Sequence, residues 1–64
     1  MLDTGLVADL PRPVEVLHDG RWCLGVLEAV QRDDGRWRAF VRYRVAPGST
    51  FLQWRDGAEV RRPA

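Results

Sequence analysis

One segment of the 64-residue sequence places an arginine or a phenylalanine at every second position, in the order Arg36, Arg38, Phe40, Arg42 and Arg44. In an extended strand, residues two apart point to the same side, so these side chains are predicted to share one face. Arginine guanidinium groups bind phosphate oxygens through paired hydrogen bonds, and an aromatic ring stacks on a nucleobase. The pattern is therefore a candidate nucleic-acid-binding face.

The same pattern has a second interpretation, a solvated strand face whose charges discourage aggregation at a sheet edge. The neighbouring acidic residues Glu28, Asp33 and Asp34 neutralise part of the arginine charge. All ten basic residues of the chain are arginines, and nine acidic residues leave a formal net charge of only +1. Because dedicated nucleic-acid binders carry a marked positive charge, the solvated face is the favoured interpretation.

The residues suited to catalysis or metal binding are few: one histidine, His18, one cysteine, Cys23, and one serine, Ser49. Their spacing does not match that of a nucleophile with its activating base. A single cysteine forms no internal disulfide, and one cysteine with one histidine does not complete a four-ligand zinc site. We therefore expect a non-enzymatic protein with no cofactor and no bound metal.

The elements that would position these side chains are β-strands, because branched and aromatic residues alternate between turn signals along the chain. Strands are predicted at residues 14–17, 21–31, 36–45, 50–54 and 59–62. Gly25 interrupts the second of these strands, which predicts a bend or bulge that lets the strand take part in two sheets. Five short strands in a chain of this size predict an all-β fold, a five-stranded small barrel.

The register of the hairpin around residues 33–35 is argued from charge. A two-residue loop would place Glu28 opposite Val41, on the core side of the sheet. A three-residue loop with a left-handed Gly35 places Leu27 opposite Val41 and leaves Glu28 diagonal to Arg42. The second register buries no charge, so it is the predicted one.

The side of strand 36–45 that faces away from the arginines is predicted to enter the core. Large rings supply a small core with buried area, so two of the three tryptophans are assigned to it, while Trp22 is expected to be half-exposed. The core residues predicted from this side of strand 36–45 and from the tryptophans are Trp37, Ala39, Val41, Tyr43, Val45 and Trp54.

The order of these elements resembles that of Tudor/agenet-type small barrels, which have a Src-homology-3-like fold. The resemblance rests on the segments VEVLHDGRW, GVLEAV, GRWRAFVRY and VRRP, which span most of the chain after Pro13. It implies a first strand, a short loop ending in an aromatic residue, a bent second strand, a third strand ending at Val-x-Tyr, and a closing Arg-Pro. The chain is also similar to small uncharacterised actinobacterial proteins.

Tudor and agenet domains often hold a methylated lysine or arginine in an aromatic cage, and the resemblance implies where such a groove would lie. The matching positions are Trp22 and Tyr43, with Phe51 as a third wall and Asp19 as a nearby negative charge. Such a cage works because a cation is attracted to the face of an aromatic ring.

These observations predict a binding module for a protein or peptide that uses the aromatic groove. Nucleic-acid binding through the arginine face and a structural accessory role are the alternatives. A cytoplasmic monomer is expected, because no apolar run approaches the ~20 residues that span a bilayer and the N-terminus lacks the basic start of a signal peptide. Residues 1–13 are predicted to form an N-terminal extension, either flexible or a short turn, and residues 14–64 the barrel.

Overall fold

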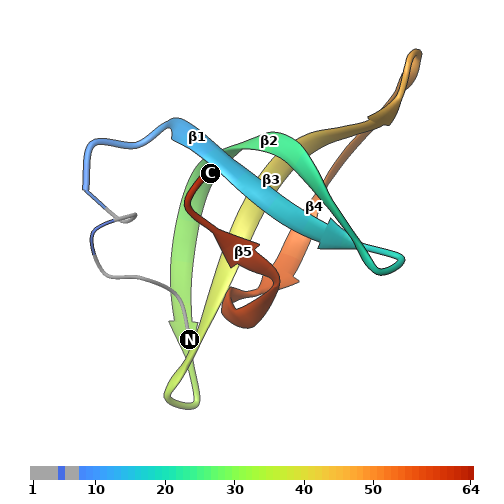
Figure 1. Ribbon diagram of the computed structural model, residues 1–64. Helices are drawn as coiled ribbons and strands as arrows, with labels where there is room; N and C mark the ends of the chain where they lie inside the picture. The colour runs from blue at the N-terminus through green and yellow to red at the C-terminus, as the bar shows by residue number, and fades with distance from the viewer. Residues whose placement is uncertain (1–4, 6–7) are drawn as a thin grey trace.

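The computed structural model describes residue 5 and residues 8–64, and its architecture is all-β (Figure 1). Five antiparallel strands form one sheet in the order β4-β3-β2-β1-β5. The elements are β1 (Arg12–His18), β2 (Arg21–Asp33), β3 (Arg36–Ala46), β4 (Ser49–Asp56), the short 3₁₀ helix η2 (Gly57–Glu59) and β5 (Val60–Arg61). The prediction of an all-β fold with five strands is confirmed. Within the described residues no ladder joins β4 to β5, so the sheet remains open.

The long, curved strand β2 organises the sheet, because it pairs with β1 through residues 21–27 and with β3 through residues 25–33 (Figure 1). At the crossing point Gly25 lies opposite Tyr43. A Cβ atom on Gly25 would lie 2.6 Å from the Arg42 carbonyl oxygen and 2.6 Å from Cβ of Tyr43. Glycine is therefore needed here for close approach of two backbones. A bend or bulge was predicted at Gly25: β2 passes from one partner strand to the other there, whereas the bulge in its register lies between Leu27 and Ala29.

The predicted three-residue loop in the β2–β3 hairpin is wrong. Asp33 pairs with Arg36, and the loop has two residues, Asp34 and Gly35, with φ angles of 49° and 75°. Positive φ at both central positions is typical of the type I′ turn that suits the twist of a hairpin. The bulge at Glu28 then shifts the register, so that Leu27 lies opposite Val41 as predicted.

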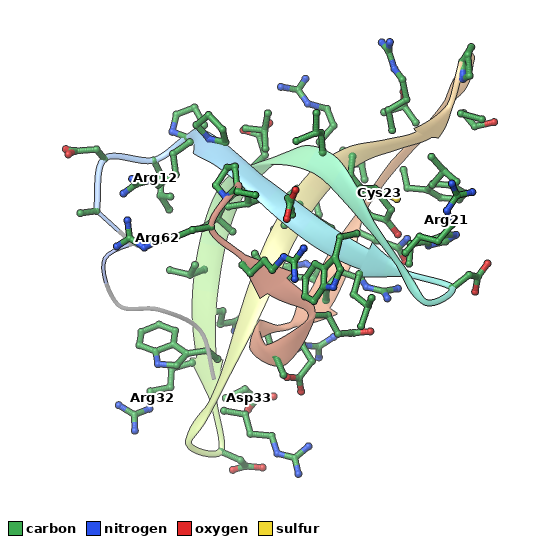
Figure 2. All side chains as sticks on the ribbon, in the orientation of Figure 1. Arg12, Arg21, Cys23, Arg32, Asp33 and Arg62 are labelled. Atoms are coloured by element: carbon green, nitrogen blue, oxygen red, sulfur yellow. The ribbon has the colours of Figure 1, made fainter. Side chains whose placement is uncertain are left out.

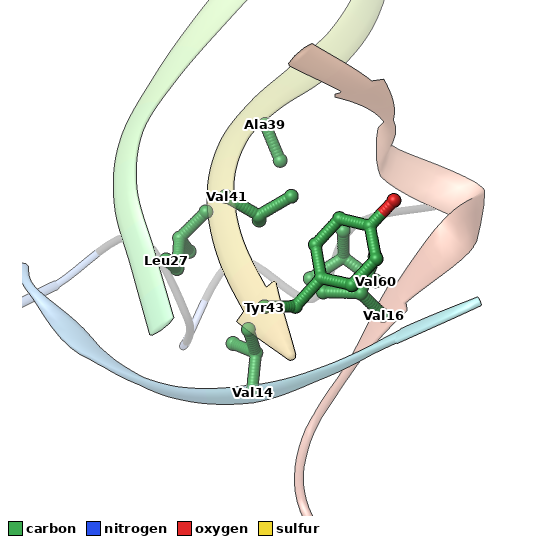
Figure 3. Packing of buried hydrophobic residues seen from close by; sticks show 7 residues of the cluster. All are labelled: Val14, Val16, Leu27, Ala39, Val41, Tyr43 and Val60. Carbon is green, nitrogen blue, oxygen red and sulfur yellow. The ribbon is translucent and has the colours of Figure 1, made fainter. Parts of the chain in front are cut away.

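The core is a cluster of buried side chains from β1, β2, β3 and β5 (Figure 3). Its members are Val14, Val16, Leu27, Ala39, Val41, Tyr43 and Val60. Trp37 is half-buried and packs against this cluster, in line with its predicted place. The core assignments of Val45 and Trp54 are wrong, since both are exposed. Val45 is the last residue but one of β3, next to the β3–β4 hairpin, which projects beyond the body of the sheet (Figure 1). Trp54 lies beside Phe40 on the face of the sheet that points away from the core.

The two sides of β3 are expected to respond differently to truncation. Val41 is fully buried, so Val41→Ala removes two buried carbons and should lower the free energy of unfolding by about 1.5 kcal/mol. Arg42 is exposed and pairs with Glu28 at 2.9 Å, a kind of contact that contributes about 0–1 kcal/mol. Urea unfolding of both variants tests this order, and equal losses would contradict the assignment of the two faces.

Part of the predicted N-terminal extension, residues 1–4 and 6–7, lies outside the described residues. The sheet begins at Arg12 rather than at residue 14. Nη1 of Arg12 donates to the carbonyl oxygens of Gly5 at 2.6 Å and Ala8 at 3.2 Å, which ties these two residues to the start of β1. Among the described residues, no helix is long and apolar enough to cross a membrane.

Candidate binding surface

The outer side of β2, β3 and β4 presents arginines around two aromatic rings. Alternation along β3 turns Arg38, Phe40, Arg42 and Arg44 away from the core, because Ala39, Val41 and Tyr43 fill it. The register with β4 then places Trp54 beside Phe40 and Leu52 beside Arg42 on the same side. We call this surface the aromatic–arginine face; it comprises Arg38, Phe40, Arg42, Arg44, Leu52 and Trp54.

Two rings meet at the centre of this face. The centroids of Phe40 and Trp54 are 5.0 Å apart and the ring planes are inclined by 43°. Trp54 remains 39% exposed, and its neighbour Leu52 is 57% exposed. Sequence reasoning placed Phe40 on this face but missed Trp54, because the alternation within β4 does not reveal which of its two sides faces the core.

The charge of the face is positive but moderate. Glu28 projects from the bulge in β2 and pairs with Arg42, the Nη2–Oε2 distance being 2.9 Å. Asp56 lies opposite Arg38, although its carboxylate also accepts a hydrogen bond from the backbone N–H of Ala58 at 2.9 Å. In the described part of the chain, Arg38 and Arg44 take part in no ion pair. These two guanidinium groups are therefore available to a ligand.

Arg36, the first residue of the predicted arginine ladder, lies apart from the other four residues. It lines a surface hollow of about 460 Å³ together with Trp37 and Gly57. The guanidinium of Arg32 lies over the Trp37 ring at 5.8 Å and partly covers it. Arg32 and Asp33 adjoin the β2–β3 turn (Figure 2), so charges of both signs surround this end of the sheet.

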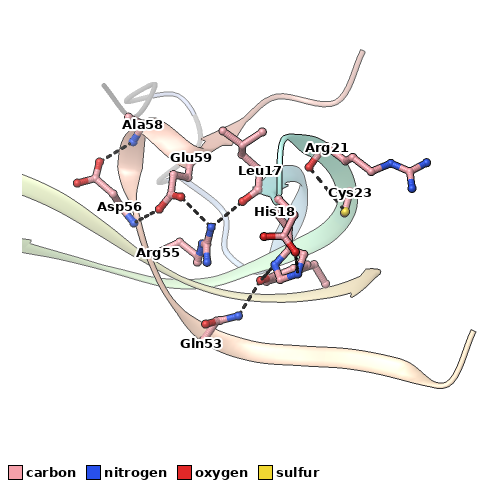
Figure 4. A network of polar contacts seen from close by, with 11 residues as sticks. Leu17, His18, Arg21, Cys23, Gln53, Arg55, Asp56, Ala58 and Glu59 are labelled. Atoms are coloured by element: carbon pink, nitrogen blue, oxygen red, sulfur yellow. Dashed lines mark hydrogen bonds and ion pairs between the residues drawn. The ribbon is translucent and has the colours of Figure 1, made fainter. Parts of the chain in front are cut away.

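The residues of the predicted aromatic groove are only partly brought together. Tyr43 and Phe51 stack with centroids 5.6 Å apart, but Tyr43 is only 1% exposed. Its hydroxyl accepts a hydrogen bond from Nε2 of Gln53 at 2.7 Å and shares another with Nδ1 of His18 at 2.9 Å (Figure 4). His18 ends β1, and its Nε2 lies 3.5 Å from the carboxylate of Asp19.

Trp22 contacts a cation that belongs to the chain itself. The guanidinium carbon of Arg61 lies 3.9 Å from the centroid of the Trp22 ring. Nε of Arg61 also donates to Glu15 at 2.7 Å, which anchors it there. One face of Trp22 is therefore occupied, and the ring of Tyr43 is inside the core, so the structure does not assemble these two residues into an open cage.

Comparisons of the chain with protein-family models, with curated proteins and with solved structures found no match.

Proposed function

We propose that the protein is a non-enzymatic recognition module that binds a partner polypeptide on its aromatic–arginine face. The observation that carries this proposal is the contact between half-buried Phe40 and exposed Trp54, whose ring centroids are 5.0 Å apart. A small domain gains stability by burying its largest rings, so a tryptophan left on the surface has another use. Tryptophan and arginine are also the residues that most often dominate the energy of protein interfaces.

The chemistry of the face indicates the kind of segment that it would bind. Arg38 and Arg44 offer guanidinium groups for carboxylates, which favours an acidic partner. Leu52 and Trp54 offer exposed apolar area beside them, which favours a large apolar side chain in the same partner. We therefore propose an acidic segment that carries at least one such residue.

Nucleic acid, the alternative ligand for the arginines, is less well supported on the same face. Glu28 already pairs with Arg42 at 2.9 Å, and Asp56 lies opposite Arg38. Arg38 and Arg44 remain without an ion pair among the described residues, which suits one or two carboxylates of a peptide better than the row of phosphates in a nucleic acid. The exposed side chain of Leu52 also offers nothing to a nucleotide backbone.

We also propose that the fold is a Src-homology-3-like small barrel of the Tudor/agenet type. The double pairing of β2 with β1 and β3 supports this assignment, because the resemblance implied a bent second strand. A side-chain bridge supports it further: Nη2 of Arg55, in β4, donates to the carbonyl oxygen of Leu17, in β1, at 2.7 Å. The bridge joins the edge strand β4 to β1, the strand next to the other edge strand, β5.

The proposed function is tested in two steps. The immobilised protein selects binders from a library of displayed random peptides, and calorimetry then measures the affinity of the selected peptides. The selected peptides are expected to combine Asp or Glu with a large apolar residue. The Trp54→Ala variant should bind them at least about tenfold more weakly, as expected for a hot-spot residue. Trp22→Ala is the matched control, because its ring lies against Arg61, and it should bind within about twofold of the unaltered protein.

Two results would contradict the proposal. Loss of peptide binding in Trp22→Ala with normal binding in Trp54→Ala would assign recognition to the predicted groove. Micromolar binding of single-stranded oligonucleotides, weakening steeply with salt and lost in the Arg38→Ala/Arg42→Ala double variant, would make nucleic acid the ligand of this face.

A further inference from the structure

Strand β4 is a long edge of the sheet, and the charged side chain that it turns inward, Arg55, is already held by Leu17 and Glu59. Within residues 5 and 8–64 it pairs with β3 alone, so one side of its backbone has no strand beside it (Figure 1). Natural edge strands are usually short, or carry lysine, proline or a bulge that blocks further pairing. β4 has eight residues, STFLQWRD, without lysine or proline, and its register with β3 is regular from Thr50 to Asp56. Exposed apolar side chains point to both faces, Phe51 to one and Leu52 and Trp54 to the other.

We propose that the occupant of this edge is a second copy of the chain, whose β4 pairs antiparallel with the first to make one continuous sheet. A two-fold axis makes residue i of one copy contact residue j of the other and the reverse, so the edge must be complementary to itself. Side chains directly opposite each other must also lie on the same face. These conditions leave two central registers, one centred on Leu52 and one centred on Gln53.

The register centred on Gln53 fits the side chains better. It places Leu52 opposite the partner's Trp54, twice by symmetry, which covers two exposed apolar side chains in each copy. The second copy therefore covers part of the aromatic–arginine face, and a polypeptide bound there would compete with the dimer. The register centred on Leu52 would instead place Trp54 opposite the partner's Thr50, leaving the ring beside a small polar residue. We therefore assign the pairing to the first register.

Charge also agrees with this register. Thr50 lies opposite the partner's Asp56. On its other side, Thr50 pairs with Arg44 of β3 in the same copy. Arg44 is exposed and has no ion pair within the described residues, so its long side chain can extend over Thr50 toward the partner's Asp56. The strand thus brings opposite charges together at both ends of the pairing. In this proposal the protein is a reversible dimer, whereas the sequence-based expectation was a monomer.

The dimer is tested by sedimentation equilibrium over a range of concentrations. Because the interface is small, a dissociation constant on the order of 10–100 µM is expected, with a mass near twice 7.3 kDa at about 1 mM. Leu52→Lys places a charge on the edge and should weaken association at least about tenfold. Leu24→Lys is the matched control, because Leu24 is 70% exposed but lies on β2, and this variant should dimerise like the unaltered protein.

A mass of 7.3 kDa at the highest concentration would overturn the proposal, as would equal weakening by the two lysine variants. Masses that climb beyond two copies would overturn it too, because two-fold pairing consumes the β4 edge.

The register is tested by cysteine cross-linking in the Cys23→Ser background, which removes the one native thiol. Opposite residues of an antiparallel pair have Cα atoms about 4.5–5.5 Å apart, within disulfide range, whereas diagonal ones are about 7–8 Å apart. Gln53→Cys should therefore form a disulfide-linked dimer under mild oxidation, and Leu52→Cys should form little. The reverse result would overturn the assigned register, provided that near-ultraviolet circular dichroism finds both variants folded.

Discussion

Replacement of Gly25 by alanine is expected to lower the free energy of unfolding by about 3 kcal/mol, a large share of the total for a domain of this size. The added Cβ would lie 2.6 Å from the Arg42 carbonyl oxygen, 2.6 Å from Cβ of Tyr43 and 3.1 Å from its Cα. These atoms belong to β3 and its first side-chain carbon, so neither a rotamer change nor a flexible side chain can relieve the clash. Overpacking of this kind costs about 3 kcal/mol or more, out of a total of roughly 3–10 kcal/mol for a domain of this size.

Gly48→Ala is the matched control for this prediction. Gly48 has a φ angle of +79°, and a Cβ there would meet no atom within 4 Å. Alanine at Gly48 therefore suffers only backbone strain, about 1–2 kcal/mol. Urea unfolding midpoints of the two variants separate the effects. If Gly25→Ala were no more damaging than Gly48→Ala, the close approach of β2 and β3 at this point would be refuted.

The strands and turns were largely predictable because they depend on local chemistry. Asp-Gly pairs at 19–20 and 34–35 adopt positive φ angles at both residues, as tight hairpin turns require. The bulge at Glu28 was not predictable, since it carries no glycine and its cause lies in two separate strands. It keeps Leu27 in the core while Glu28 reaches Arg42. The charge argument correctly predicted that Leu27 pairs with Val41, but it attributed this pairing to a three-residue loop rather than to a bulge.

The surface was predictable only where a strand has one clearly apolar side. On β3 that side is unambiguous, so Arg38, Arg42 and Arg44 were correctly placed outside. On β4 both sides mix apolar and polar residues, and Arg55 rather than Trp54 turns toward the interior. Hydrophobicity alone assigns these two residues the wrong way round. The pairing of β4 with β3 decides the matter, because Arg55 lies opposite buried Ala39.

Arg55 turns inward because its guanidinium group bridges two parts of the fold. Nη2 of Arg55 donates to the Leu17 carbonyl oxygen and to Oε2 of Glu59, both at 2.7 Å (Figure 4). The other carboxylate oxygen, Oε1 of Glu59, accepts from the backbone N–H of Asp56 at 3.2 Å and completes the capping box of η2. One arginine thus connects β4 to β1 and fixes the turn that leads to β5.

Arg55→Ala is expected to lower the free energy of unfolding by about 2–3 kcal/mol, because hydrogen bonds that involve a charged group contribute about 1.5–3 kcal/mol each when partly buried. The loss is less than the sum of two such bonds, because Nε of Arg55 is buried without a partner among the described residues and alanine removes that penalty. Arg55→Lys keeps the charge but not the planar fork, so it should recover only part of the loss.

The measurement is a double-mutant cycle of Arg55→Ala and Glu59→Ala by urea unfolding, with Arg42→Ala/Glu28→Ala as the matched exposed pair. The coupling energy of the Arg55 pair should exceed about 1 kcal/mol, against less than about 0.5 kcal/mol for the Arg42 pair. Arg55 and Glu59 have side chains 20% and 35% exposed, compared with 56% and 29% for Arg42 and Glu28, so the guanidinium group of Arg55 is the better shielded from water. Equal coupling in the two pairs would mean that the bond to Leu17, rather than the ion pair with Glu59, accounts for the stability lost in Arg55→Ala. In that case Glu59→Ala alone would leave stability almost unchanged while Arg55→Ala would still weaken it.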